Sequence, residues 1–277
     1  DTFAVWANAG FDTATTLNLI EAWATSLSYT FQLYFDFSGY CDMAIGISLM
    51  FNIKLPINFN SPYKALSIQD FWRRWHMTLS RFLRDYIYIP LGGNRKGEIR
   101  TYTNLLATFL IGGLWHGAGW TFIVWGALHG IALAIHRAWQ SLGFKMNKIL
   151  AWFITFNFVN ITWIFFRAKD FESAMKVLGS MFSLDNIILP EKYFKFLVEY
   201  NDIYFRYGTV YENILGKDKT TTFILVGLLV VLLFKNSMEL RATFFKLPKV
   251  FIYISIVVMA YTLTNMTKFT EFLYFNF

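Results

Sequence analysis

A histidine set among four glycines follows an apolar segment that is too short to cross a lipid bilayer. The segment covers residues 103–115, and His116 comes next, inside the sequence GGLWHGAGW of residues 112–120. About 13 residues at about 1.5 Å each reach about 20 Å, whereas a hydrocarbon core about 30 Å thick needs about 20 residues. We therefore predict that this helix breaks near His116 before it has crossed the membrane.

The glycines around His116 leave two interpretations open. Glycine tolerates a helix break and lets other groups approach the backbone closely. Irregular backbone at membrane depth persists only where protein or a water-filled cavity satisfies its amides, and an ionisable side chain there is a candidate functional group. The alternative is a histidine that packs and hydrogen-bonds beside a glycine kink. These features alone do not separate the two.

The composition predicts an all-α polytopic membrane protein. Of the 277 residues, 56% are hydrophobic and only 16% are charged, which lies outside the usual balance of a soluble domain. We expect one transmembrane domain over residues 1–277. Because the sequence begins at Asp1, we also expect a piece of a longer chain that lacks N-terminal spans. A single cysteine, Cys41, excludes a disulfide within this sequence and is interpreted as a packing residue.

Basic residues are concentrated in one segment. Residues 54–100 hold nine basic and three acidic side chains, a net charge of +6 where the whole chain has +7. The positive-inside tendency places this segment on the cytoplasmic side of a lipid bilayer, and it does not call for nucleic acid as a partner. Residues 190–220 hold five side chains of each sign and are the candidate for the outer side. The short connection at residues 235–249 is then inside and the C-terminus outside.

Apolar runs predict embedded or spanning helices at residues 11–35, 37–53, 120–139, 149–166, 221–234 and 250–263, with an amphipathic helix at 171–182. Asp36 falls at the junction of the first two runs, where a helix cap is favoured over a catalytic role. Pro56 and Pro62 mark a loop at residues 54–63.

One continuous amphipathic helix is expected after that loop. Ser67 is a candidate N-cap, with Asp70 three positions on, and residues 90–94 (PLGGN) end the helix near Tyr86. At about 100° per residue, His76 falls on an apolar face with two tryptophans, opposite a row of arginines. The apolar face is Trp72, Trp75, His76, Leu79, Phe82, Leu83 and Tyr86; the polar face includes Arg73, Arg74, Arg81 and Arg84.

Two further histidines lie on the span at residues 120–139. His129 shares a face with Trp125 and is a third candidate site residue. His136 and Arg137 lie near the end of the span, where an interfacial role is favoured over a catalytic one.

Three classes of chemistry compete for these histidines. The spacings between them are 40, 13 and 7 residues, without the i, i+4 pairs of histidine-ligated metal enzymes, so no metal or redox cofactor is expected. A transporter would use broken helices but gives no reason for the basic, tryptophan-rich segment. An acyltransferase explains both: arginines bind the phosphates of a coenzyme A thioester, and a neutral histidine removes the proton of a hydroxyl.

The sequence resembles the membrane-bound O-acyltransferase family, in its bacterial branch of alginate and peptidoglycan O-acetyltransferases and the teichoic-acid D-alanyl transferase. The resemblance extends to the aromatic ending at residues 272–277. It is carried by residues 34–40 (YFDFSGY), 42–46 (DMAIG), 55–63 (LPINFNSPY), 71–80 (FWRRWHMTLS), 84–86 (RDY), 90–93 (PLGG), 113–117 (GLWHG) and 125–130 (WGALHG).

The resemblance implies helices around a central tunnel, with broken or re-entrant helices, in the bacterial inner membrane. It implies His116 as the catalytic base and His76 as the second catalytic-site residue. Donor-binding or supporting roles fall on Trp75, Arg73, Arg74, Trp115 and His129. For the arginines, membrane topology and lipid headgroup contact remain the alternative.

The reaction implied is acetyl transfer from acetyl-coenzyme A, as donor substrate rather than bound cofactor, to an extracytoplasmic polysaccharide such as alginate or peptidoglycan. A periplasmic or secreted partner of the SGNH-hydrolase type is expected to pass the acetyl group on. D-alanyl transfer to teichoic acid from a carrier protein, or transport of a small anionic or acyl substrate, remains as the alternative.

Overall fold

The computed structural model describes residues 2–184, 187–190, 205–217, 219–246 and 248–265. The predicted aromatic ending lies outside these ranges, as do residues 191–204 and 218 of the predicted outer loop at 190–220. The helices are α1 (Thr2–Asn8), α2 (Leu19–Met50), α3 (Ile68–Trp72), α4 (Met77–Leu83), α5 (Glu98–His116), α6 (Trp120–Ser141), α7 (Lys148–Arg167), α8 (Phe171–Phe182), α10 (Lys219–Leu233), α11 (Ser237–Thr243) and α12 (Val250–Asn265), and the strands β1 (Ile187–Pro190) and β2 (Phe205–Gly208) pair in parallel.

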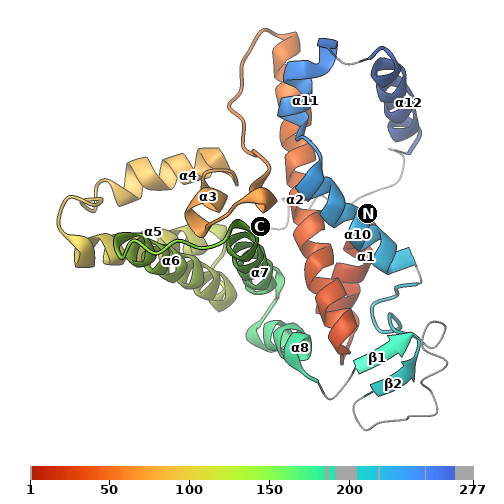
Figure 1. Ribbon diagram of the computed structural model, residues 1–277, viewed down its shortest axis with the longest axis horizontal. Coiled ribbons are helices and arrows are strands. Elements are labelled where there is room, and N and C mark those ends of the chain that lie inside the picture. Colours follow the sequence, from red (N-terminus) through yellow and green to blue (C-terminus); the bar gives the residue numbers. More distant parts are fainter. Residues whose placement is uncertain (1, 185–186, 191–204, 218, 247, 266–277) are drawn as a thin grey trace.

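The long helix α2 runs through the middle of the structure (Figure 1). Helices α1, α7, α8 and α10 pack against it. Helices α3 to α6 lie on one side of α2, and α10 to α12 on the other, with α12 apart from the rest (Figure 1). The predicted all-α class is therefore confirmed, with two short strands as the exception.

Helices α6 and α7 are long and apolar enough to cross a membrane, and α10 with α11 passes the same test as a pair bent by 53°. The helices predicted at residues 120–139 and 149–166 are thus confirmed nearly to the residue, and α8 matches the predicted amphipathic helix in full. The bent pair fulfils the expectation of a broken helix. A central tunnel stays a prediction.

The prediction of two helices meeting at Asp36 is wrong, because one helix, α2, runs from Leu19 to Met50. It begins at a capping box: Asn18 accepts a hydrogen bond from the Glu21 amide, and Glu21 accepts one from the Asn18 amide, at 2.9 and 3.0 Å. This box satisfies amides that a helix start leaves open. Asp36 therefore lies inside a helix and is not a cap, and residues 9–13 form a separate π-helical turn.

The prediction of a single amphipathic helix after Ser67 is also wrong, because the helix is interrupted at His76 and the segment forms two helices, α3 and α4. Its start is confirmed, since the Ser67 hydroxyl accepts a hydrogen bond from the Asp70 amide at 3.1 Å. A further π-helical turn, Arg84–Tyr88, follows α4.

Helices α5 and α6 form a tightly packed hairpin. A Cβ on Gly126 would collide with the Phe109 carbonyl oxygen, and one on Gly130 would lie 2.8 Å from the Leu106 Cα. At the open end of the hairpin, Arg137 donates two hydrogen bonds to Glu98, at 2.8 and 2.9 Å. The glycines thus let two helix backbones touch, and α5 ends at His116 as the sequence predicts.

We expect Gly126→Ala to destabilise the protein, because the added methyl group must push α5 away from α6. Overpacking of this kind costs about 1–3 kcal/mol. The measurement is the thermal unfolding midpoint of the detergent-solubilised protein. Gly179→Ala in α8 is the matched control: nothing lies within 4 Å of its added Cβ, so the midpoint should stay level or rise, since alanine is the better helix former by about 0.5–1 kcal/mol. Equal midpoints for the two variants would contradict the close packing.

Candidate active site

The break that positions His76 is a single residue in the left-handed region, with φ 41° and ψ 55°. The loop at residues 54–63 supplies the hydrogen bonds that the broken helix cannot make. The Met77 amide donates to the Asn58 carbonyl at 3.1 Å, and the Asn60 amide donates to the Arg74 carbonyl at 2.9 Å. The Asn58 side-chain oxygen accepts from both the amide and the hydroxyl of Thr78, at 3.1 and 2.6 Å.

His116 lies at the last residue of α5, where Gly117 continues the chain in an extended conformation, φ 173°. Its imidazole is enclosed by rings from two other helices, with centroids 5.2 Å from Trp125 of α6 and 4.9 Å from Phe166 of α7, both edge to face. The histidine is therefore held by packing from α6 and α7 at the end of the helix.

His76 and His116 line the same cavity, although 40 residues separate them. Its volume is about 20 Å³, room for about one water molecule. Phe37 of α2 packs edge to face on His76 with ring centroids 4.9 Å apart. We call this space the histidine cavity; it is lined by Leu33, Phe37, Trp72, Trp75, His76, Leu79, His116, Trp125, Trp163 and Phe166.

A second and larger cavity, of about 440 Å³, contains three arginines. We call it the arginine cavity. It lies between the α3–α4 segment and helices α5 and α6, and Trp72 is a wall of both this cavity and the histidine cavity. Its lining is Gln69, Trp72, Arg73, Met77, Ser80, Arg81, Leu83, Arg84, Tyr88, Leu105, Thr108, Phe109 and Leu133.

The other site residues expected from the sequence fall in different places. Trp75 is buried and lines the histidine cavity, stacked on Phe71 at 5.7 Å. Arg73 lines the arginine cavity, whereas its neighbour Arg74 forms a 2.8 Å salt bridge with Asp70. Trp115 is 57% exposed and packs edge to face on His116 from outside the cavity lining.

His129 is fully buried, and both of its ring nitrogens have partners. Trp72 Nε1 donates to its Nδ1 at 3.1 Å, and its Nε2 lies 3.1 Å from the Thr162 hydroxyl. It lines neither the histidine cavity nor the arginine cavity. The described residues contain no group of three or more His, Cys, Asp or Glu side chains arranged to hold a metal ion.

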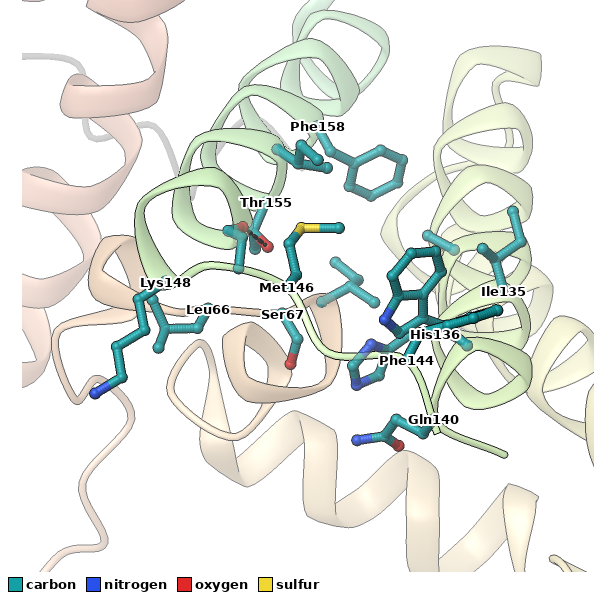
Figure 2. A pocket seen from close by; sticks show the side chains of 15 residues that line it. Leu66, Ser67, Ile135, His136, Gln140, Phe144, Met146, Lys148, Thr155 and Phe158 are labelled. Atoms are coloured by element: carbon teal, nitrogen blue, oxygen red, sulfur yellow. Dashed lines mark hydrogen bonds between the residues drawn. The ribbon is translucent and has the colours of Figure 1, made fainter. Parts of the chain in front are cut away.

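His136 lies apart from the other histidines, on a third cavity of about 520 Å³ between α6, α7 and the start of α3. Figure 2 shows its ring beside Gln140 and Phe144, with Thr155 and Phe158 on the facing helix. This cavity shares no lining residue with the other two. His136 is therefore separate from the pair formed by His76 and His116.

The sequence does not predict the walls of the histidine cavity that come from α2 and α7. Leu33 and Phe37 come from α2, and Trp163 and Phe166 from α7, whereas Leu79 of α4 lies on the face predicted for His76. The helical spacing predicts Trp125 on the same face as His129, but it does not predict the contact between Trp125 and His116. The available signal was the high aromatic content, 20% of the chain, which does not say which rings meet.

A family model described as MBOAT, membrane-bound O-acyltransferase family, matches residues 2–174, which include both histidines of the cavity and every motif of the resemblance up to residue 130. The chain belongs to the membrane-bound O-acyltransferase family. The family predicted from the sequence motifs is thus confirmed, and with it the membrane character of the chain.

Several curated proteins are similar to this chain. A peptidoglycan O-acetyltransferase from Helicobacter pylori is 53% identical, over 100% of this chain and 53% of its own length. A probable alginate O-acetylase AlgI from Pseudomonas putida is 52% identical over 62% of this chain and 36% of its own. A teichoic acid D-alanyltransferase from Streptococcus thermophilus is 36% identical over 50% and 39%. The chain spans about half the length of the first relative and less of the others.

Asn58→Ala should destabilise the His76 bend, because the Thr78 amide and hydroxyl lose their shared acceptor. An unsatisfied buried donor costs about 1–3 kcal/mol, so the thermal unfolding midpoint should fall. Asn157→Ala is the matched control: the exposed Asn157 side chain donates only to the Phe153 carbonyl within its own helix. A drop no larger for Asn58→Ala than for Asn157→Ala would show that the loop does not hold the bend.

Proposed function

We propose that the full-length protein is a membrane O-acyltransferase that moves an acetyl group from cytoplasmic acetyl-coenzyme A to a hydroxyl group on the outer side of the bacterial inner membrane. One observation carries the proposal: His76 and His116, from separate elements, line one aromatic cavity that shares the wall Trp72 with an arginine-lined cavity. A proton acceptor and an anion-binding space are thus adjacent. Both are needed to use a phosphate-bearing thioester.

In the proposed step, His116 acts as general base and His76 orients the thioester or assists. The imidazole of His116 takes the proton of the acceptor hydroxyl as its oxygen attacks the thioester carbonyl carbon. The tetrahedral intermediate then collapses, the carbon–sulfur bond breaks, and the coenzyme A thiolate leaves and takes up the proton from the imidazolium. The products are an acetyl ester and free coenzyme A.

The tetrahedral intermediate carries a negative oxygen that needs a donor. Trp125 lines the cavity, packs on His116, and has a buried indole N–H without a hydrogen-bond partner among the described residues. A buried donor in apolar surroundings stabilises developing charge more than one in water. We therefore assign to the Trp125 indole N–H the role of hydrogen-bond donor to this oxygen, next to His116, whose ring it contacts.

Donor binding is assigned to the arginine cavity. Arg73, Arg81 and Arg84 are suited to the phosphates of coenzyme A, since guanidinium groups form paired, charge-assisted hydrogen bonds with phosphate oxygens. These arginines belong to the basic segment at residues 54–100, for which we propose the cytoplasmic side. Arg74 has no part in this, because it does not line the arginine cavity. Arg84 lines that cavity and is also paired with Asp85 at 2.7 Å.

For the acceptor we propose a polysaccharide, reached directly or through a secreted partner of the SGNH-hydrolase type. Support comes from relatives whose names specify peptidoglycan and alginate acetylation, at 53% and 52% identity. D-alanyl transfer is the second candidate, because a teichoic acid D-alanyltransferase is 36% identical over half of this chain.

His116→Ala should abolish transfer, with a fall of at least about 10²–10⁴-fold from loss of the general base. The assay follows label from radioactive acetyl-coenzyme A in membranes that contain the full-length protein, with and without the secreted partner. His136→Ala is the control, since this histidine lies on the separate cavity, and should keep its activity. Retained transfer by His116→Ala, at normal protein levels, would remove His116 from the mechanism; label in no sample would favour a carrier-protein donor or transport.

Arg73→Gln should raise the KM for acetyl-coenzyme A about tenfold, because a charge-assisted hydrogen bond worth about 1.5–3 kcal/mol is lost, while kcat changes little. The comparison is Arg100→Gln, which removes the same charge from the basic segment but not from the arginine cavity. Steady-state kinetics at fixed ionic strength decide the matter. Equal KM values for the two variants would leave only a topological role for Arg73.

A further inference from the structure

Trp72 lines both cavities, and we call its side chain the partition between them. Its indole lines the histidine cavity on one side and the arginine cavity on the other. Neighbouring rings fix its position from the α5 and α6 sides: Phe109 at 4.9 Å and Trp125 at 5.9 Å, both edge to face. A thioester bound with its phosphates among the arginines and its carbonyl carbon at the histidines would therefore extend along the Trp72 side chain.

The indole N–H of Trp72 is also hydrogen-bonded, and the bond defines the state of His129. Trp72 Nε1 can only donate, so His129 Nδ1, 3.1 Å away, accepts and carries no proton. The Thr162 hydroxyl donates its single proton to the Val159 carbonyl at 2.8 Å. It therefore accepts from His129 Nε2, which is 3.1 Å away and carries the proton of a neutral imidazole.

This arrangement leaves His129 without a free lone pair for a substrate proton. Protonation at Nδ1 would break the bond to Trp72, and the ring is fully buried and outside both cavity linings. The chain of bonds runs instead from α7 through His129 on α6 to Trp72 at the end of α3. It connects the consecutive helices α6 and α7 to α3, which lies about 50 residues earlier in the sequence, and it ends on Trp72.

We propose that His129 is a positioning residue that holds Trp72 as the partition between the arginine and histidine cavities, and that Trp72 thereby restricts transfer to short acyl groups. The inference rests on the proposed acyltransferase function. The size of the histidine cavity, about 20 Å³, supports it. That volume holds about one water molecule, so an acyl group enters only when another wall moves, and a fixed Trp72 then limits how long the acyl group can be.

Two variants of His129 and one of Trp72 test the proposal in the full-length protein. His129→Leu removes the acceptor, whereas His129→Asn keeps a side-chain oxygen near the position of Nδ1. Trp72→Phe removes the donor and half of the ring system. The assay measures kcat and KM with acetyl-, propionyl- and butyryl-coenzyme A.

We expect His129→Leu and Trp72→Phe each to lower kcat for acetyl transfer on the order of 10-fold with little change in donor KM, as misplacement of one positioning group does. The preference for acetyl over butyryl should fall in both. The double variant should be no worse than either single one, because both remove the same bond. His129→Asn should restore activity to near the wild-type level.

Trp152→Phe is the matched control. Its indole N–H donates to the Tyr63 carbonyl at 2.9 Å, a bond of similar length that touches neither cavity, so kcat and acyl preference should not change. Additive losses in the double variant, an unchanged acyl preference, or a His129→Asn enzyme as impaired as His129→Leu would overturn the proposal.

A measurement without turnover separates this proposal from the proposed function. In ¹⁵N spectra of histidine- and tryptophan-labelled protein, His129 should show the neutral form protonated at Nε2, and His129→Leu should shift the Trp72 indole N–H signal while His136→Leu does not. If the wild type transfers no acyl group from any donor, the proposed function fails, and these spectra still decide whether His129 holds Trp72. An unshifted Trp72 signal in His129→Leu overturns the inference by itself.

Discussion

The left-handed backbone at His76 is the constraint on which the arrangement of the site depends. A helix that breaks in apolar surroundings leaves amides and carbonyls that water cannot reach. Here the loop at residues 54–63 satisfies them, through main-chain bonds of Asn58 and Asn60 and the Asn58 side chain. The break separates Trp72, at the end of α3, and Trp75, in the turn that follows, from α4, so that the two tryptophans form one wall of the histidine cavity and Leu79 another.

The second histidine depends on a different kind of contact. Glycines of α5 and α6 bring two helix backbones together, and the end of α5 then places His116 against Trp125 of the partner helix. Helix α7 adds Phe166 and is itself tied to α2, because the buried Asn160 side chain accepts hydrogen bonds from Ser26 and Thr30 at 3.0 and 2.7 Å. Backbone packing on one side and a buried polar contact on the other thus fix the walls of one small cavity.

Sequence patterns predicted those structural features whose cause lies within a few neighbouring residues. The ends of α7 and α8, the Ser67 cap and the helix end at His116 follow from polarity and glycine content within a few residues, and all were predicted. The His76 break was not, because the hydrogen-bond partners that make it possible lie 14 to 20 residues upstream, in the loop around Asn58 and Asn60. A helical wheel treats every residue as helical and has no means of placing this break.

Arg73 and Arg74 show the same limit within the site. The two residues are adjacent, and the sequence assigns both the same donor-binding or supporting role. In the structure Arg73 lines the arginine cavity, whereas Arg74 forms a salt bridge with Asp70, which lies one helical turn before it. The pairing of His76 with His116 was predicted only through the family resemblance, since nothing local relates positions 40 residues apart. The walls from α2 and α7 were missed for the same reason.

The small size of the histidine cavity bears on how substrates reach it. About 20 Å³ holds about one water molecule, so a thioester and a hydroxyl enter together only if a wall moves. The walls are not equally fixed. Those from α2 and α7 are joined by Asn160, and those from α5 and α6 by backbone contact through glycine, whereas α4 is a seven-residue helix held at its start by Asn58. Helix α4, which contributes Leu79, is therefore the least firmly held wall of the cavity, whereas Trp72, at the end of α3 and at the boundary with the arginine cavity, stays bonded to His129.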